Sequence, residues 1–176
     1  MNSKIKKIRM IISDIDGVWT DGSFYKGTDG QEFKKFNVND GVGVAMAKAA
    51  GYKIALISGR YSPATEYRAK ELNIEDVYNG GLNKITAYEE LKIKYNLIDS
   101  EIAYVGDDLI DIPVMEKVGI PIAVANAIMS VKEISTYITK TAGGYGAFRE
   151  SVSWIIEQQG RMDDILKTMK EHILKS

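Results

Sequence analysis

The fold is indicated by Ile8-Arg9-Met10-Ile11-Ile12-Ser13-Asp14-Ile15-Asp16-Gly17, where two acids stand at the end of an apolar run. Residues 8–13 read as a buried strand that ends in a glycine turn. Ligands of open α/β sheets bind in the crevice at the carboxyl ends of the strands. Asp14 and Asp16 lie two positions apart, so both side chains project to one side if the strand continues. An ordinary Asp-Gly turn is the alternative. If the two carboxylates instead lie together in a crevice, they repel each other, and a bound divalent metal ion is the simplest way to offset that repulsion.

Composition limits the classes of function. The 176 residues are long enough for one well-buried domain, 1–176, and short for two. The formal net charge of −1 leaves no broad basic surface, so we expect no nucleic-acid partner. The chain has no cysteine, so oxygen ligands must hold any metal, which favours Mg²⁺. No apolar run approaches the roughly 20 residues that span a bilayer, so we expect a cytoplasmic protein without a membrane partner.

Strands and helices alternate after residue 40, which predicts a Rossmann-like α/β fold with a parallel sheet and helices on both faces. Asn39 or Asp40 can cap a first helix that Gly51 stops, and Ser62 with Pro63 can open the next. The other expected elements are strands at 54–57, 77–78, 102–105 and 120–124, and helices at 63–72, 84–95, 112–118 and 129–135.

Two segments break this alternation. Residues 23–36 place aromatic side chains around a Gly-Thr-Asp-Gly turn, which predicts a β-hairpin after the first acidic motif. Its aromatic residues form an apolar ribbon that something must cover: Phe24, Tyr25, Phe33 and Phe36. The C-terminal helical segment 161–175 carries apolar side chains along one face, and it packs either on its own domain or on a partner.

Polar residues follow three later segments as well. Ser58-Gly59-Arg60 closes an apolar strand, Lys84 begins a helix, and the cluster Asp107-Asp108-Leu109-Ile110-Asp111 follows another strand. Together with Asp14-x-Asp16-Gly17-x-x-Thr20, these segments resemble, in order, the four motifs of the haloacid dehalogenase superfamily of phosphatases. The resemblance implies a fold without a separate cap domain, because no long insertion other than the hairpin lies between the first three motifs.

The resemblance also assigns roles. It implies that Asp14 attacks phosphorus to give an aspartyl-phosphate, while Asp16 protonates the departing oxygen and then activates water. Mg²⁺ would bind Asp14, the backbone carbonyl of Asp16 and Asp107. The phosphate oxygens would be held by Ser58, the backbone near Gly59, and Lys84. Asp108 would stand close behind the metal or orient Lys84, and Asp111 would either join the site or cap the helix that Pro113 opens.

Segments 36–41, 104–115 and 143–150 look like one subgroup, the 3-deoxy-D-manno-octulosonate 8-phosphate phosphatases and their nonulosonate 9-phosphate relatives. This resemblance implies hydrolysis of a sugar-acid phosphate in lipopolysaccharide precursor synthesis, and a homotetramer in which paired hairpins close the sites. The substrate residues that it implies are Asn37, Asp40, Gly41 and Arg68; for Arg68 a surface ion pair is the competing interpretation. Arg60 stands at a strand end, where we expect an exposed cation that binds a substrate carboxylate rather than a merely solvated side chain.

The chain departs from the octulosonate pattern at a few positions. Asn39 and Ala45 replace arginines, Val42 replaces a tyrosine, and Tyr145 replaces an arginine. These changes keep a nonulosonate 9-phosphate (of the KDN or sialic acid type) open as the substrate. A third possibility is an oligomerisation module like those fused to sialate cytidylyltransferases, although the presence of all four motifs argues against it.

Overall fold

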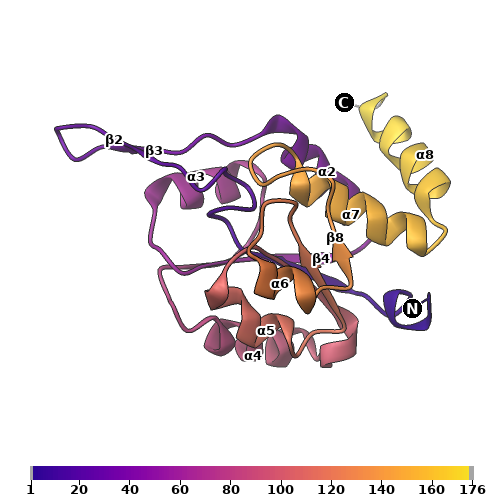
Figure 1. The fold of residues 1–176 in the computed structure, drawn as a ribbon. Coiled ribbons are helices and arrows are strands. Elements are labelled where there is room, and N and C mark those ends of the chain that lie inside the picture. Colours follow the sequence, from indigo (N-terminus) through magenta and orange to yellow (C-terminus); the bar gives the residue numbers. More distant parts are fainter. Residues whose placement is uncertain (1, 175–176) are drawn as a thin grey trace.

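The computed structural model of the chain describes residues 2–174. Within them, six parallel strands form one sheet in the order β5-β4-β1-β6-β7-β8. Figure 1 shows this sheet enclosed between layers of helices. The central strand β1 lies between β4 and β6, so the chain reverses its direction across the sheet there, and such a point opens a ligand crevice. The strands are β1 Met10–Ser13, β4 Lys53–Ser58, β5 Asp76–Asn79, β6 Ile102–Gly106, β7 Ile120–Ala123 and β8 Tyr137–Ile138.

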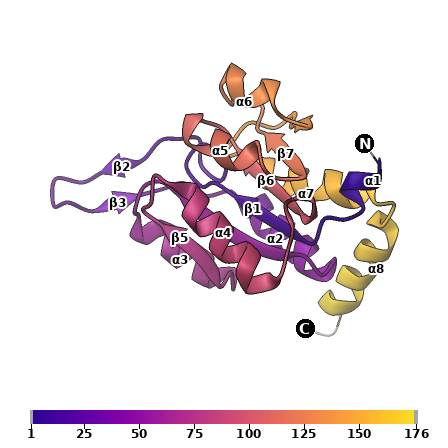
Figure 2. The same cartoon turned by 90° about the horizontal axis from the view of Figure 1, so that it is seen from below.

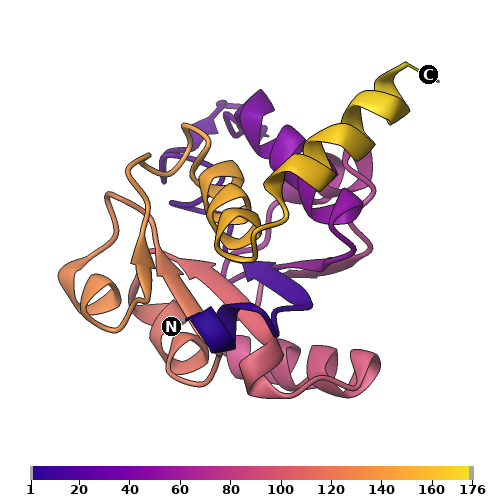
Figure 3. The same cartoon turned by 90° about the vertical axis from the view of Figure 1, so that its right-hand side faces the viewer.

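Helices cover both faces of the sheet, which confirms the predicted α/β architecture (Figure 3). α2 (Val38–Ala49) and α7 (Ala147–Gln158) pack together on one face, and α4 (Lys84–Tyr95) and α5 (Ile112–Met115) pack on the other. All four residues of β1 are buried, as expected for a strand covered on both sides. The shorter elements are α1 Asn2–Ile5, α3 Pro63–Glu71, α6 Met129–Glu133, and the 3₁₀ turns η1 Asp99–Glu101 and η2 Leu109–Asp111.

The C-terminal helix α8 (Met162–Ile173) packs on its own chain, which decides between the two alternatives left by the sequence. It lies against α2 and α7, on the side of these helices away from the sheet (Figure 3). Ile165 is buried, and Met162 and Met169 are partly buried against the core. Leu166 stays 42% exposed, so the apolar face is only partly covered. The predicted end of this segment at residue 175 lies outside the described residues. None of the described helices is long and apolar enough to cross a bilayer.

The helix starts differ from the prediction in their caps, and one helix was missed. α2 begins at Val38, because Asn37 is extended and its side chain accepts a hydrogen bond from the Asn39 backbone N–H, which makes Asn37 the cap instead of Asn39 or Asp40. Ser62 occupies the cap position of α3 but makes no side-chain cap bond. α7 was not predicted, and its cap is a glycine, Gly146, rather than a side chain that would signal a helix start.

The hairpin of residues 23–36 is present as β2 (Tyr25–Lys26) paired with β3 (Glu32–Phe33). Figures 1 and 2 show it extending from the body of the molecule at the end opposite both chain termini. Tyr25 and Phe33 are cross-strand partners and are 62% and 58% exposed. Phe36 differs from the expectation, because it packs against the core. Among the described residues, the connection from β4 to β5 holds only α3, so no cap domain is inserted there.

Candidate active site

The carboxyl ends of three neighbouring strands bring the predicted polar residues to one edge of the sheet. Asp14 follows β1, Ser58 ends β4, and Asp107 follows β6. The Asp14 backbone N–H donates to the Val105 carbonyl at 2.9 Å, which holds the first acid against β6. The expectation that these motifs meet in one crevice is therefore borne out by the sheet topology.

Lys84 lies at the centre of a buried ion-pair network. Its side chain is fully buried, and its Nζ lies 2.6 Å from Asp14 Oδ1 and 2.7 Å from Asp111 Oδ1. Asp111 also accepts hydrogen bonds from the Tyr104 hydroxyl at 2.6 Å and from the Asp107 backbone N–H at 2.9 Å. Asp111 is thus fully engaged, and it fixes both the Lys84 ammonium and the backbone that carries Asp107.

The contacts of Asp108 and Asp111 differ from those predicted. Asp108 is exposed and accepts a bond from the Leu109 backbone N–H at 2.7 Å, so it caps the turn η2 and does not orient Lys84. Asp111 makes that contact instead. Its side chain makes no cap bond to α5, so of the two interpretations of Asp111 the structure favours the site over the helix cap. Tyr104 was missed, because a tyrosine within an apolar strand carries no distinguishing signal.

Burial and the repulsion between neighbouring carboxylates raise the pKa of two acids in this cluster. Burial, followed by the charge of Asp111, raises the pKa of Asp14 to about 7, although Lys84 acts in the opposite direction. Burial, followed by the charges of Asp14 and Asp111, raises the pKa of Asp107. Burial alone would lower the pKa of Lys84, but its two carboxylate partners outweigh that effect and raise it. Asp14 and Asp107 are therefore short of nearby positive charge, and a further cation between them would lower the pKa of both carboxyl groups.

The residues fit a hard divalent cation. Carboxylate oxygens of Asp14, Asp107 and Asp111 lie within 4.8 Å of one another, and Asp107 Oδ1 is buried without a hydrogen-bond partner. The loop after Asp14 approaches this carboxylate closely, since a Cβ on Gly17 would lie 1.9 Å from Asp107 Oδ2. Oxygen donors of this kind suit Mg²⁺. Because the oxygens of Asp111 are already engaged, Asp14 and Asp107 are the side chains that would hold the cation.

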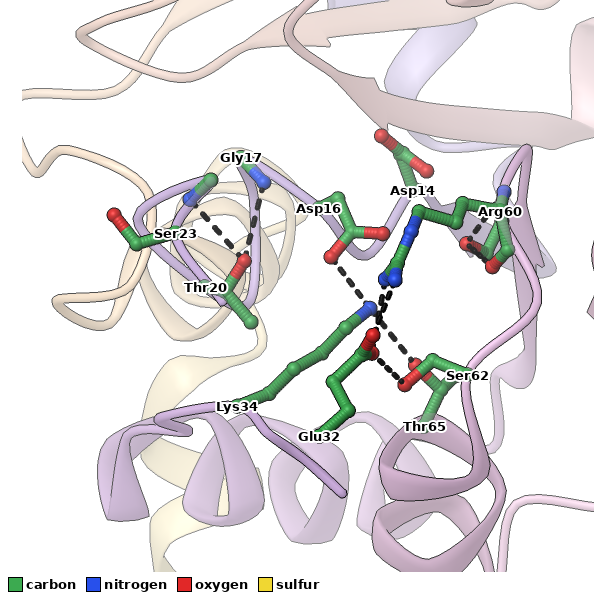
Figure 4. Close-up of polar contacts among 12 residues, drawn as sticks. Asp14, Asp16, Gly17, Thr20, Ser23, Glu32, Lys34, Arg60, Ser62 and Thr65 are labelled. Atoms are coloured by element: carbon green, nitrogen blue, oxygen red, sulfur yellow. Dashed lines mark hydrogen bonds and ion pairs between the residues drawn. The ribbon is translucent and has the colours of Figure 1, made fainter. Parts of the chain in front are cut away.

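The loop after Asp14 is shaped by the last residue of its motif (Figure 4). The buried Thr20 hydroxyl accepts hydrogen bonds from the backbone N–H groups of Gly17 and Gly22, at 3.3 and 3.2 Å. Asp16 lies in this loop, and its Oδ2 is buried and has no hydrogen-bond partner. Its Oδ1 lies 2.5 Å from Nζ of Lys34, a residue of the hairpin segment that sequence reasoning did not select.

The base of the hairpin makes a second polar cluster beside Asp16 (Figure 4). The Arg60 guanidinium donates two hydrogen bonds to Glu32, one of them at 2.9 Å to Oε1, and the Ser62 hydroxyl donates to the same oxygen at 3.0 Å. The bond from Arg60 is the main reason that the pKa of Glu32 falls to about 2. Arg60 is thus paired within the chain, and its contact with a substrate carboxylate stays a prediction. The missed signal is that Glu32 and Lys34 alternate in a predicted strand, which places them on one side.

The predicted phosphate-binding residues of the second motif are engaged in their own turn. The Ser58 hydroxyl donates to the Arg60 carbonyl at 2.8 Å, and the Ser58 carbonyl accepts from Gly80 and Gly81. This turn carries Gly59, which packs closely on Ile110. Contact of Ser58 and Gly59 with phosphate stays a prediction.

The predicted substrate residues on α2 are also used within the fold. Asp40 is fully buried and accepts from the Arg149 backbone N–H at 3.2 Å, so it anchors the start of α7 and does not face the crevice as expected. Burial raises the pKa of Asp40 to about 6. The Asn37 side chain donates to the Gly144 carbonyl at 3.3 Å. Gly41 lies where a Cβ would come within 3.2 Å of Arg68, which makes it a packing residue.

Arg68 lies on α3 at the rim of a groove beside the hairpin base. Its guanidinium pairs with Glu71 at 2.7 Å, so the competing ion-pair interpretation is the one that the structure favours. Its Nε is buried and unpartnered. The groove next to it has a volume of about 400 Å³ and is lined by residues that include Lys34, Phe36 and Tyr67.

The loop of residues 143–146 packs on the loop that follows Asp14 in the same chain. The Gly144 backbone N–H donates to the Val18 carbonyl at 3.0 Å. A Cβ on Gly143 would lie 1.6 Å from the Gly17 carbonyl oxygen, so only glycine allows this approach. Tyr145 is 56% exposed, and the Lys35 ammonium lies 4.8 Å from the centre of its ring.

Comparison with known proteins finds relatives that cover most of the chain. The model of a haloacid dehalogenase-like hydrolase family matches residues 67–147, which include Lys84 and the acidic cluster. The chain is 43% identical over 162 residues to the 3-deoxy-D-manno-octulosonate 8-phosphate phosphatase KdsC of Escherichia coli K12, covering 92% of this chain and 86% of that protein.

Solved structures give the same result. A HAD superfamily (subfamily III A) hydrolase described as putative, from Legionella pneumophila, superposes with a TM-score of 0.92 at 36% identity, covering 97% of this chain and 93% of that one. The 3-deoxy-D-manno-octulosonate 8-phosphate phosphatase of Moraxella catarrhalis, solved with magnesium, phosphate and KDO, superposes with a TM-score of 0.91 at 36% identity, covering 96% and 97%.

Proposed function

The chain belongs to the 3-deoxy-D-manno-octulosonate 8-phosphate phosphatase family of haloacid dehalogenase-like hydrolases, and we propose that it hydrolyses that sugar-acid phosphate with Mg²⁺. The observation that carries the proposal is the cluster of Asp14, Asp107, Asp111 and Lys84 at the sheet edge. This cluster combines a nucleophile, a fixed ammonium and a site for a cation, which are the groups that phosphoryl transfer from a monoester needs.

In the proposed reaction, a carboxylate oxygen of Asp14 attacks phosphorus and forms an aspartyl-phosphate as the bond to the sugar oxygen breaks. Lys84 keeps Asp14 oriented and adds positive charge near the phosphoryl group. When bound between Asp14 and Asp107, Mg²⁺ would neutralise charge so that the carboxylate and the phosphate dianion can approach each other.

Asp16 is the proposed acid and base. It gives a proton to the departing sugar oxygen, and it later takes a proton from the water that hydrolyses the aspartyl-phosphate. Its unpartnered Oδ2 supports this role, because that oxygen is available to exchange a proton in the crevice. Ser58 and Gly59 remain the proposed phosphate contacts, and the groove beside Lys34 and Arg68 offers room for the sugar.

A nonulosonate 9-phosphate is the second candidate substrate. The observation in its favour is that four expected side chains differ: Asn39, Val42, Ala45 and Tyr145. Asn39 accepts a bond from the Arg149 guanidinium at 2.9 Å, so a cation is present near this position but comes from α7. A cation on α7, instead of at position 39, suits a sugar acid with a longer carbon chain than that of the octulosonate.

We further propose that residues 1–176 act as one phosphatase domain within a homotetramer. The exposed pair Tyr25 and Phe33 on the projecting hairpin supports this assembly, because contiguous exposed aromatics mark interaction surfaces. The loop 143–146 contributes to the subunit contact or to a neighbour's site in this proposal, through the exposed side chain of Tyr145. Light scattering tests the assembly: we expect a tetramer for the unmodified chain and dissociation in a Tyr25→Ser, Phe33→Ser double variant. A monomer formed by the unmodified chain would contradict the proposal. The cytoplasmic location stays a prediction.

The decisive experiment is phosphate release from a panel of sugar phosphates. We expect 3-deoxy-D-manno-octulosonate 8-phosphate to give the highest kcat/KM, activity to vanish with a chelator, and added Mg²⁺ to restore it. A higher kcat/KM for a nonulosonate 9-phosphate would favour the second candidate. Full activity in excess chelator, or no release from any sugar phosphate, would contradict the proposed enzyme.

A further inference from the structure

Lys34 is a buried cation that the reaction above does not use. It lies between β3 and α2, and its side chain is fully buried. Its Nζ is 2.5 Å from Asp16 Oδ1 and 3.4 Å from the Thr65 hydroxyl (Figure 4). Lysine is almost never fully buried unless it is paired, so the contact with Asp16 is what holds this ammonium inside the protein.

The hairpin base is itself held in place, so Lys34 enters the crevice from a fixed position. Two residues earlier, Glu32 accepts bonds from Arg60 and Ser62, which belong to the connection from β4 to α3. Residues two apart in an extended segment share one side, and Figure 4 shows Glu32 and Lys34 both directed at the crevice.

The two oxygens of Asp16 are in different states. Lys34 binds Oδ1, whereas Oδ2 is buried and has no partner. A carboxyl group that is anchored at one oxygen cannot rotate freely, and its second oxygen keeps one direction. This arrangement suits a group that must meet a proton acceptor at one defined place.

We propose that Lys34 is the positioning residue for Asp16 in the proposed phosphatase reaction. It holds Oδ1, so that Oδ2 gives its proton to the bridging sugar oxygen as the bond from that oxygen to phosphorus breaks. Oδ2 then takes a proton from the attacking water, which returns Asp16 to its starting form. In this role Lys34 orients the carboxyl group of Asp16 and exchanges no proton with the substrate. The inference rests on the proposed function, because it assigns a partner to the acid and base of that reaction.

The test separates leaving groups that need a proton from those that do not. Lys34→Met removes the ammonium with little loss of volume, and Lys35→Met is the matched control, since Lys35 is the neighbouring residue and pairs with Asp21 at the surface. Both variants are assayed on the sugar phosphate and on p-nitrophenyl phosphate, whose leaving group needs little protonation. Lys34→Arg keeps a cation, and thermal melting checks the fold of every variant.

We expect Lys34→Met to lower kcat on the sugar phosphate about 100-fold and on p-nitrophenyl phosphate less than about tenfold. KM should stay within about threefold of the unmodified enzyme, because the Lys34 ammonium is engaged by Asp16 and Thr65 and is not available to bind the substrate. Lys34→Arg should recover part of the lost kcat on the sugar phosphate, and Lys35→Met should keep the ratio between the two substrates unchanged.

Equal losses of kcat on both substrates, in a folded Lys34→Met variant, would overturn the positioning role. A raised KM with unchanged kcat would also overturn it, since Lys34 would then bind substrate. The unmodified enzyme reports separately on the proposed function, because it must hydrolyse the sugar phosphate whatever Lys34 does.

Discussion

The crevice contains two fully buried lysines that come from different parts of the molecule. Lys84 lies at the start of a core helix and is shared by the buried carboxylates of Asp14 and Asp111. Lys34 comes from the hairpin segment and pairs with one carboxylate, Asp16, which is 29% exposed. In the proposed reaction, the core lysine belongs to the groups that act on phosphorus, and the hairpin lysine to the group that acts on the leaving oxygen.

This difference indicates how the site is assembled. The groups that act on phosphorus sit at strand ends and a helix start, so the sheet alone fixes them. The group that serves the leaving oxygen is completed by a two-stranded ribbon that projects from the body, as Figures 1 and 2 show. A change in the hairpin can therefore alter the treatment of the leaving group while the nucleophile stays in place.

The largest expected effect is on the core side. Asp14→Asn should lower turnover by at least about 10⁴-fold, because an amide is a poor nucleophile and a weak Mg²⁺ ligand. Steady-state phosphate release measures the loss, and circular dichroism checks the fold. Asp164→Asn, on the exposed side of α8, is the control and should keep normal turnover. Normal turnover of Asp14→Asn would remove Asp14 from the reaction.

The two lysines should differ in what they contribute to stability. Lys84→Met leaves two buried carboxylates without their cation and should cost about 3–5 kcal/mol of unfolding free energy. Lys34→Met leaves only the partly exposed Asp16 and should cost about 1 kcal/mol. Urea unfolding without added metal gives both values. A larger loss for Lys34→Met than for Lys84→Met would reverse the comparison.

The difference between the sheet edge and the hairpin also explains which site residues could be predicted from the sequence. Asp14 was identified because it follows an apolar strand. Lys84 and Asp107 were identified because their segments resemble, in order, the later motifs of the haloacid dehalogenase superfamily. Lys34, Glu32 and Tyr104 were missed because their roles depend on tertiary contacts: where the hairpin folds, and which strand residue faces Asp111.

Two residues expected at the substrate make contacts within the chain that the sequence did not reveal, for the same reason. Asp40 was expected at the substrate, but it lies within α2 and turns inward to meet the start of α7, more than one hundred positions later in the chain. Arg60 was expected to be free, but its partner Glu32 comes from the hairpin. Neither partner is visible in the local sequence pattern, since both contacts join segments that are distant along the chain.

Tyr104 gives a smaller test of the core network. Tyr104→Phe removes the hydroxyl that donates to Asp111 at 2.6 Å, within a fully buried site. We expect a loss of about 1.5–2 kcal/mol in unfolding free energy, as for a hydrogen bond to a charged group. Tyr78→Phe is the control, because Tyr78 is only half-buried on β5, and it should unfold nearly as the unmodified chain does. Equal stabilities of the Tyr104→Phe variant and the unmodified chain would show that Asp111 does not depend on this bond.

The smallest expected effect concerns the hairpin anchor and depends on pH. The pKa of Glu32 is lowered from 4.5 to about 2, chiefly by the bond from Arg60. A lowered pKa means that this contact stabilises the fold fully above about pH 4.5 and loses its contribution as the pH falls toward 2. Because Arg60 is partly solvated, Glu32→Gln should cost only about 1 kcal/mol at neutral pH. The difference from the unmodified chain should shrink on acidification; a difference that grows would contradict the ion pair.

Chemical trapping tests most directly which of the two neighbouring acids attacks phosphorus. Enzyme turning over the sugar phosphate with Mg²⁺ is quenched rapidly in acid and treated with borohydride, which reduces an acyl phosphate to the alcohol but leaves free carboxylates unchanged. Mass spectrometry of the peptide that contains both acids then locates the reduced residue. The account predicts reduction at Asp14 alone, dependent on substrate and absent in Asp14→Asn. Reduction at Asp16, or none at either residue during turnover, would contradict it.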